Sequence, residues 1–292
     1  MDVVIQILVT GATLGAMYAL ATIGLSLLWG SLGMLNMAHG AMLTFGGYIA
    51  FTAMVDLGLP MPAALVLALA AGAVFGLLIY YLVVRHMLRS AAFETNVIIA
   101  TVGLAIALEN SILQVYGGQP FGQPLSVSGS FSIGSVNVPF QNLLIVVLAV
   151  VLMSLVAWLL KGTRMGRAIR AVSQSREAAL LMGVPVDRVF AQVLALAGLL
   201  AAFSGVLLSS ITMLSPTLGA DPMLKAFIMC VVAGLGNIPG SIIAAFALAV
   251  LEASVQYLAG ARWGFPALLG IVIVALIWRP YGVFGRVQVR RL

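Results

Sequence analysis

Charged residues are scarce in this chain. Of its 292 residues, 14 are Lys or Arg and 8 are Asp or Glu, which together make 8% of the sequence. Soluble proteins carry roughly a quarter charged residues, so an ordinary soluble domain is excluded. Hydrophobic residues make up 63%, and several runs exceed the ~20 apolar residues needed to cross hydrocarbon. The composition predicts an all-α polytopic membrane protein.

Cysteine, histidine and lysine are also scarce, and each scarcity excludes a class of chemistry. The single cysteine, Cys230, excludes an intrachain disulfide. His39 and His86 lie far apart without thiol or carboxylate neighbours, so no metal site is expected. Neither Lys161 nor Lys225 follows a glycine, so the sequence lacks the lysine of a Walker phosphate loop. We therefore expect no catalytic residues, no cofactor and no metal in this chain, which is not itself an enzyme.

The apolar runs recur along the whole chain. They cover residues 4–29, 34–55, 61–84, 93–115, 141–160, 190–213, 223–236, 238–259 and 263–279. Most of the basic residues follow the third, fifth and last of these runs, whereas 117–139 contains no charged residue. The positive-inside rule then assigns 85–92, 161–189 and 280–292 to the cytoplasm and 116–140 to the outside. The basic residues are thus explained by the orientation of the chain in the membrane, and no nucleic-acid partner is expected.

Two of the runs are irregular, and the charge distribution decides how they are counted. Run 34–55 is rich in glycine, and run 223–236 is short for a full span. Both must cross, if only as broken or unwound segments, for the basic tail to end inside. This gives nine crossings in one transmembrane domain over 1–292, with the N-terminus outside and the C-terminus inside.

The order of the runs also predicts an internal symmetry. The triplet formed by the first three runs starts outside, whereas the triplet formed by 190–213, 223–236 and 238–259 starts inside. Each triplet has a glycine-interrupted middle member. This is the pattern of an inverted-topology repeat, in which discontinuous helices line a route near the midplane of the membrane.

A few polar residues lie inside the apolar runs, where they need partners or water. The candidates for lining a translocation route are Asn36, His39, Gly40, Glu109 and Glu252. Glu252 and Gln256 share a helical face at i, i+4. The alternative interpretation is that these side chains form hydrogen bonds between neighbouring helices. The sequence leaves both interpretations open.

The basic loop 161–189 is the strongest signal in the sequence. Ser175 can cap a short helix, which Gly183 and Pro185 would end. The helix is more apolar than a solvated loop, which suggests that it is buried against a soluble partner. Its candidate docking residues are Glu177, Ala178, Ala179, Leu180 and Gly183. A helix that lies on the membrane surface and binds anionic lipid through its arginines is the alternative.

A glycine-rich stretch, 233–241, follows the seventh run. Because no phosphate-binding lysine accompanies it, we interpret it as a chain reversal near the cytoplasmic face. Pro239 suits the first turn of the following helix.

These motifs carry a resemblance to a known family. Glu177-Ala178-Ala179-x-x-x-Gly183 resembles the cytoplasmic coupling motif of ABC-importer permeases, which binds in a groove of the ATPase. Three further motifs look like those of LivH-type permeases of branched-chain amino acid uptake. They are Asn36-x-Ala38-His39-Gly40, Gly166-Arg167-Ala168-Ile169-Arg170-Ala171 and Gly234-x-Gly236-Asn237-x-x-Gly240. In one departure, Ala233 stands where the family commonly has glycine, which reduces the backbone freedom expected there.

The resemblance implies a set of partners in a bacterial inner membrane. They are a second permease of LivM type, two cytoplasmic ATPases and an extracytoplasmic substrate-binding protein, with membrane lipid around the bundle. The implied function is a permease subunit of an ATP-driven importer for branched-chain or other amino acids. The chain would form half of the pathway and dock one ATPase. The alternative is a stand-alone secondary transporter or channel for a small polar solute such as urea or a short amide.

Overall fold

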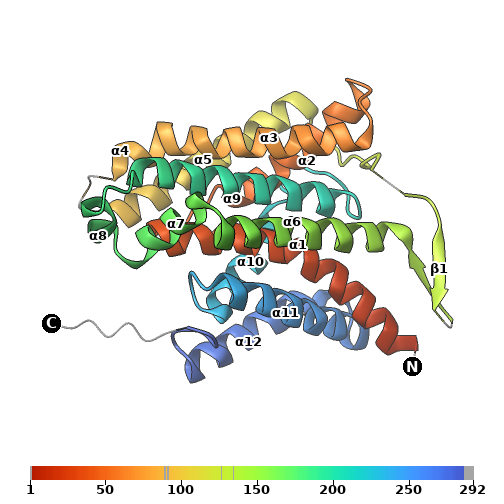
Figure 1. The fold of residues 1–292 in the computed structure, drawn as a ribbon. Coiled ribbons are helices and arrows are strands. Elements are labelled where there is room, and N and C mark those ends of the chain that lie inside the picture. The colour runs from red at the N-terminus through yellow and green to blue at the C-terminus, as the bar shows by residue number, and fades with distance from the viewer. Residues whose placement is uncertain (1, 89, 91, 126, 134, 286–292) are drawn as a thin grey trace.

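The computed structural model describes residues 2–88, 90, 92–125, 127–133 and 135–285. It is a bundle of long helices whose axes are roughly aligned (Figure 1). The N-terminus and a small hairpin lie at one end of the bundle, and α4, α7 and α8 lie at the other. Within the described residues, seven helices are long and apolar enough to cross a membrane, so the predicted helical polytopic class is confirmed.

The long helices follow the predicted apolar runs to within a few residues. They are α1 (Asp2–Leu32), α3 (Met61–Ile79), α5 (Phe93–Tyr116), α6 (Phe140–Gly162), α9 (Val186–Ser209), α11 (Ile238–Ala259) and α12 (Gly264–Trp278). A π-helical turn, η1 (Tyr80–Val84), joins α3 to α4 (Arg85–Met87), and a 3-10 turn, η2 (Ala261–Trp263), precedes α12.

The two irregular runs contain short helices. The helix α2 (His39–Val55) has 17 residues and α10 (Ala220–Ala233) has 14. At 1.5 Å per residue they extend about 26 and about 21 Å, less than the ~30 Å of a hydrocarbon core. Non-helical chain precedes both, over 33–38 and 210–219. The interruption expected from the glycines is therefore present, and α2 starts only at His39.

The N-terminal ends of α2 and α10 touch one another inside the bundle. A Cβ atom added to Gly40 would lie 2.8 Å from the carbonyl oxygen of Gly219, and one added to Gly219 would overlap that of Gly40. The Gly219 amide donates a hydrogen bond to Thr44 Oγ1 at 2.9 Å. Since neither glycine has a side chain, the two backbones can approach this closely.

Two helix pairs make the most extensive contacts, α1 with α11 and α3 with α9. Small residues bring both pairs together, because Gly11 on α1 faces Val250 and Gly72 on α3 faces Gly198. Glycine at such crossings allows close backbone packing. This packing matters in a membrane because the hydrophobic effect does not drive helices together in lipid. The core is centred on α1 and α9.

The structure corrects the all-α prediction in one place. Strands β1 (Ser130–Ile133) and β2 (Val136–Pro139) form an antiparallel hairpin in the uncharged loop. The alternation of serine with apolar residues over 130–133, and of valine with asparagine over 136–138, is a strand pattern that the loop assignment overlooked. A further bridge pairs Phe121 with Leu214 and ties this loop to the segment before α10.

Candidate functional site

A buried ion pair joins α10 and α11. Lys225 Nζ lies 2.7 Å from Glu252 Oε1 and 3.0 Å from Asp221 Oδ2. It also donates a hydrogen bond to the Tyr18 hydroxyl on α1 at 3.2 Å. Glu252 is fully buried and accepts a second hydrogen bond from Gln256 Nε2 at 3.0 Å. The pair therefore fixes the short helix α10 to both α1 and α11.

The sequence predicted only part of this cluster. The shared face of Glu252 and Gln256 is confirmed by their hydrogen bond. Lys225 was missing from the predicted polar residues, although it lies inside the apolar run 223–236. A lysine within an apolar run normally needs a carboxylate partner, and this signal could have identified Lys225. Asp221 lies just before the predicted start of the run, since α10 begins earlier than expected.

Asn36 and His39 are buried against neighbouring backbone. Asn36 Oδ1 accepts a hydrogen bond from the Ala38 amide at 3.0 Å, which stabilises the turn before α2. His39 Nε2 donates to the Ala21 carbonyl on α1 at 3.0 Å. Both side chains are 1% exposed or less. In this arrangement they brace the start of α2, and their role in translocation stays a prediction.

Glu109 is one of the residues that line a cavity of about 280 Å³ with both polar and apolar walls. Glu109 and Asn110 of α5 line one side, and Ser215 and Thr217 of the segment before α10 line the other. The structure thus brings the predicted residue Glu109 into one cavity with Ser215 and Thr217, which were not predicted. Glu252 is not among the residues that line this cavity.

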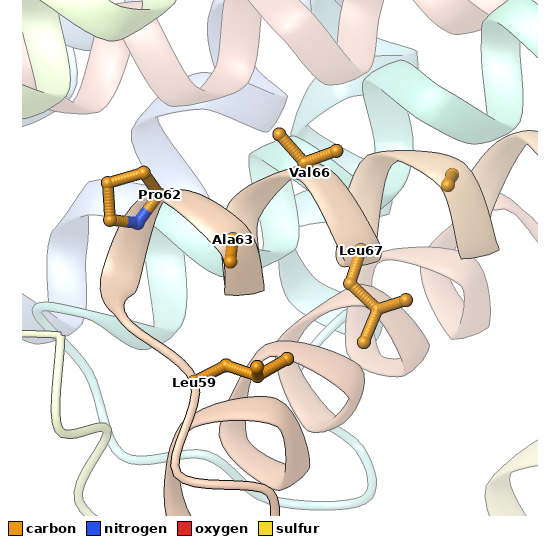
Figure 2. A pocket seen from close by; sticks show the side chains of 6 residues that line it. Leu59, Pro62, Ala63, Val66 and Leu67 are labelled. Atoms are coloured by element: carbon orange, nitrogen blue, oxygen red, sulfur yellow. The ribbon is translucent and has the colours of Figure 1, made fainter.

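A larger groove of about 500 Å³ runs along the outer face of α3. Its lining side chains, including Leu59, Val66 and Leu67, are all apolar (Figure 2). Such a surface can accommodate a lipid chain or another helix, but it offers no group that would bind a polar solute.

The basic loop folds into two short helices, α7 (Arg164–Gln174) and α8 (Arg176–Leu181). Thr163 Oγ1 caps α7 by accepting from the Gly166 amide at 3.1 Å. Ser175 Oγ caps α8 by accepting from the Ala178 amide at 3.2 Å, which confirms the predicted cap. Gly183 has a φ of +77°, as its predicted role in ending the helix requires.

The tip of this loop exposes apolar side chains. Leu180 is 59% exposed, Leu181 is 86% exposed and Met182 is 84% exposed. Ala179, by contrast, is buried, and the guanidinium of Arg176 stacks over the Phe190 ring of α9 at 5.4 Å. The base of α8 is thus fixed to the bundle while its tip is uncovered. Ala178 and Glu177 are also exposed.

The glycine-rich reversal has the predicted form. Gly234 and Gly236 have φ values of +96° and +85°. Asn237 Oδ1 accepts a hydrogen bond from the Gly240 amide at 3.0 Å and so caps α11, with Pro239 in its first turn. Ala233 remains helical as the last residue of α10. Of residues 233 and 234 only Gly234 has a positive φ, so the alanine at 233 is compatible with this turn.

Long apolar helices and two interrupted segments define a helical polytopic membrane protein, and an exposed basic loop lies at one end of it. Residues 7–277 match the model of the branched-chain amino acid transport system permease component family. The chain belongs to this family. It is accordingly a permease subunit of an ABC-type import system and lies in the cell membrane.

Several relatives align over most of their length. BraD of Pseudomonas aeruginosa, a high-affinity branched-chain amino acid transport permease, is 29% identical over 99% of this chain and 98% of its own. LivH of Salmonella typhimurium is 29% identical over 99% of this chain and 97% of its own. A probable LivH of Methanocaldococcus jannaschii is 27% identical over 91% of this chain and 88% of its own.

Proposed function

We propose that this chain is one of two permease subunits of an importer for branched-chain or other amino acids and that α8 docks one ATPase. The solute class is supported by relatives whose names specify branched-chain amino acid transport. The chain itself hydrolyses no ATP, and its movements follow those of the ATPase.

The exposed tip of α8 carries the proposal. Three consecutive large apolar side chains, Leu180, Leu181 and Met182, project from a basic loop. Apolar groups in water are stabilised when a partner covers them, by roughly 25 cal/mol per Å² buried. The anchored base of α8, with Ala179 buried and Arg176 over Phe190, can transmit a displacement of the tip directly to α9. This is the requirement for converting ATPase closure into alternating access.

For the membrane topology we propose nine crossings, with the N-terminus outside and loop 161–189 inside. The end of the bundle that carries α4, α7 and α8 (Figure 1) also carries most of the described basic residues, which supports this orientation. The segments 33–55 and 210–233 would each cross as a non-helical stretch followed by a short helix. Part of the proposed inner tail, residues 286–292, lies outside the described residues.

We also propose the inverted repeat. A twofold axis in the membrane plane would relate α1 to α9, α2 to α10 and α3 to α11. Under that operation the α1–α11 contact corresponds to the α9–α3 contact, and these are the two most extensive in the bundle. The Gly40–Gly219 contact would lie on the axis, because it joins equivalent ends of α2 and α10.

The full complex would contain a second permease of LivM type, two cytoplasmic ATPases and an extracytoplasmic substrate-binding protein. Selectivity would reside largely in the binding protein. Mild-detergent extraction from the native host should bring down all of these subunits. Recovery of this chain alone, active in transport without ATP, would instead support a secondary transporter.

The docking prediction is tested at Leu181. Leu181→Asp should reduce the amount of ATPase that co-purifies by more than about tenfold, because a desolvated, unpaired charge at an interface costs several kcal/mol. The thermal stability of the membrane bundle should not change, since Leu181 is 86% exposed in this chain. The measurement is the ratio of ATPase to permease after affinity purification.

Leu181→Met is the matched control, because it keeps an apolar side chain of similar volume. It should retain the ATPases. If Leu181→Asp also keeps its ATPases and transports normally, α8 does not dock them. The loop would then be interpreted as a segment that binds anionic lipid.

The orientation is tested with introduced cysteines. In a Cys230→Ala chain whose transport has been verified, a thiol reagent that cannot cross membranes should label Gln119→Cys in intact cells. It should not label Ser173→Cys, although both positions are exposed in this chain. Ser173→Cys should react only after the membrane is permeabilised. The opposite pattern would reverse the topology and remove α8 from the cytoplasm.

A further inference from the structure

Helix α5 presents polar side chains on a surface that the described residues of this chain leave exposed. Only Val97, Thr101 and Ile112 of α5 are buried, whereas Asn110 and Gln114 are exposed. An amide side chain in hydrocarbon lacks the hydrogen bonds that water would give it, so it normally faces protein or a wet cavity.

Helix α12 shows the contrasting case. It is even less covered by the rest of the chain than α5. Its exposed side chains, including Ile273, Val274 and Ile277, are all apolar. This surface suits lipid without further partners, whereas the surface of α5 does not. The two faces therefore have different surroundings in the complex.

The cavity of about 280 Å³ lies beside this surface of α5. The residues that line it include Glu109, Asn110, Ser215 and Thr217, each of which has a polar side chain. The groove along α3 contains no polar side chain (Figure 2). Of these two hollows, only the cavity at α5 can hydrogen-bond a polar solute.

The chain continues from this cavity into α10, where a carboxylate is exposed. The side chain of Asp221 is 63% exposed and lies in the first turn of α10. That turn follows directly on Gly219, which packs against Gly40 inside the bundle. An exposed carboxylate at this depth cannot face lipid without a large cost in free energy.

The buried ion pair holds Asp221 in place and leaves an excess of negative charge. Lys225 is shared between Asp221 at 3.0 Å and Glu252 at 2.7 Å, so one ammonium group serves two carboxylates. Glu252 Oε2 is buried and has no hydrogen-bond partner. None of the described residues that line the nearby cavity is basic, and Glu109 is an acidic residue among them. The local field thus favours a cation.

We propose that Asp221 binds the ammonium group of a zwitterionic solute on this chain's half of the pathway, with Asn110 and Thr217 lining the approach. The proposal rests on the proposed function, since it presumes a second permease across the pathway. The ammonium group would occupy the exposed side of the Asp221 carboxylate and complete the charge balance that Lys225 leaves open.

A simpler role for Asp221 is to stabilise the N-terminus of α10, where an anion interacts favourably with the helix dipole. That role needs neither exposure nor a neighbouring polar cavity. It also does not require that molecules approaching from outside be positively charged. The two roles are therefore distinguished by whether external reagents reach the site and by whether a cationic reagent reacts there faster than an anionic one.

The test uses the assembled complex in right-side-out vesicles, with Cys230→Ala as background. Asn110→Cys and Thr217→Cys are treated with a cationic and an anionic methanethiosulfonate, neither of which crosses membranes. Both positions should react, whereas Val151→Cys should not. Val151 on α6 is a matched control because it is 60% exposed in this chain among apolar side chains.

At Thr217→Cys the cationic reagent should react about tenfold faster than the anionic one, after correction for their reactivities with a free thiol. Adding Asp221→Asn should lower this preference by about threefold and should raise the KM for zwitterion uptake. If neither cysteine reacts, or if Asp221→Asn leaves the preference unchanged, the proposal is wrong.

The ATPases distinguish this outcome from a failure of the proposed function. Docking is assigned to α8, at the other end of the bundle. Retained ATPases together with an unchanged charge preference would count against Asp221 alone. A wild-type complex that contains no ATPase would count against the importer itself.

Discussion

Lys225→Met is expected to destabilise the bundle by roughly 3–5 kcal/mol, because it leaves the Glu252 carboxylate buried without its counter-charge. Glu252 has no exposed surface, and Lys225 is 7% exposed. Methionine fills nearly the same volume, so a loss of packing cannot account for the effect. The measurement is the free energy of unfolding of the purified protein in mixed micelles, obtained by titration with SDS.

The double variant Lys225→Met/Glu252→Gln should recover most of that loss. Removing both charges eliminates the unpaired carboxylate, and replacing a complete buried ion pair with neutral groups is often close to neutral. Glutamine at 252 can still hydrogen-bond with Gln256. Recovery in the double variant would identify the unpaired charge as the cause of the single variant's instability.

Lys161→Met is the matched control, because Lys161 is the other lysine of the chain and is exposed at the end of α6. Its loss should cost less than about 1 kcal/mol. If Lys225→Met unfolds no more readily than Lys161→Met, the ion pair does not stabilise α10.

The sequence was sufficient to predict the apolar helices, the interruption of two of them and the capped helix α8. Each depends on local chemistry: an apolar run long enough to cross, a glycine before His39, or Ser175 at a helix start. These features need no knowledge of which helices are neighbours, and for that reason they can be recognised in a single sequence.

The ion pair and the cavity could not be predicted in the same way. Lys225 and Glu252 are 27 residues apart, and Tyr18 comes from the opposite end of the chain. Their meeting depends on how α1, α10 and α11 pack, which depends on close contacts at glycines such as that of Gly11 with Val250. For the same reason the sequence selected Glu109 but not Ser215 or Thr217, which pairing with a distant loop brings beside it.

Close backbone contact also explains where the bundle cannot accommodate a larger side chain. Gly205 on α9 lies against Leu43 on α2, and a Cβ atom at 205 would overlap the Leu43 carbonyl oxygen. Backbone cannot move aside as a flexible side chain can. Because α2 packs mainly on α9 and α3, a displacement here would also disturb the contact between Gly40 and Gly219.

Gly205→Ala should therefore destabilise the bundle by roughly 1–3 kcal/mol or more through overpacking, although alanine is the better helix former. Gly270→Ala is the matched control, since Gly270 also lies within a helix, α12, and nothing would meet its Cβ within 4 Å. That variant should gain up to about 1 kcal/mol from helix propensity. The SDS titration midpoints and the yields of assembled complex report both effects. Opposite signs at the two glycines are expected, because only one of them lies at a helix crossing. If Gly205→Ala is as stable as Gly270→Ala, α2 can shift on α9 without cost, and the close crossing does not hold the start of α2 in place.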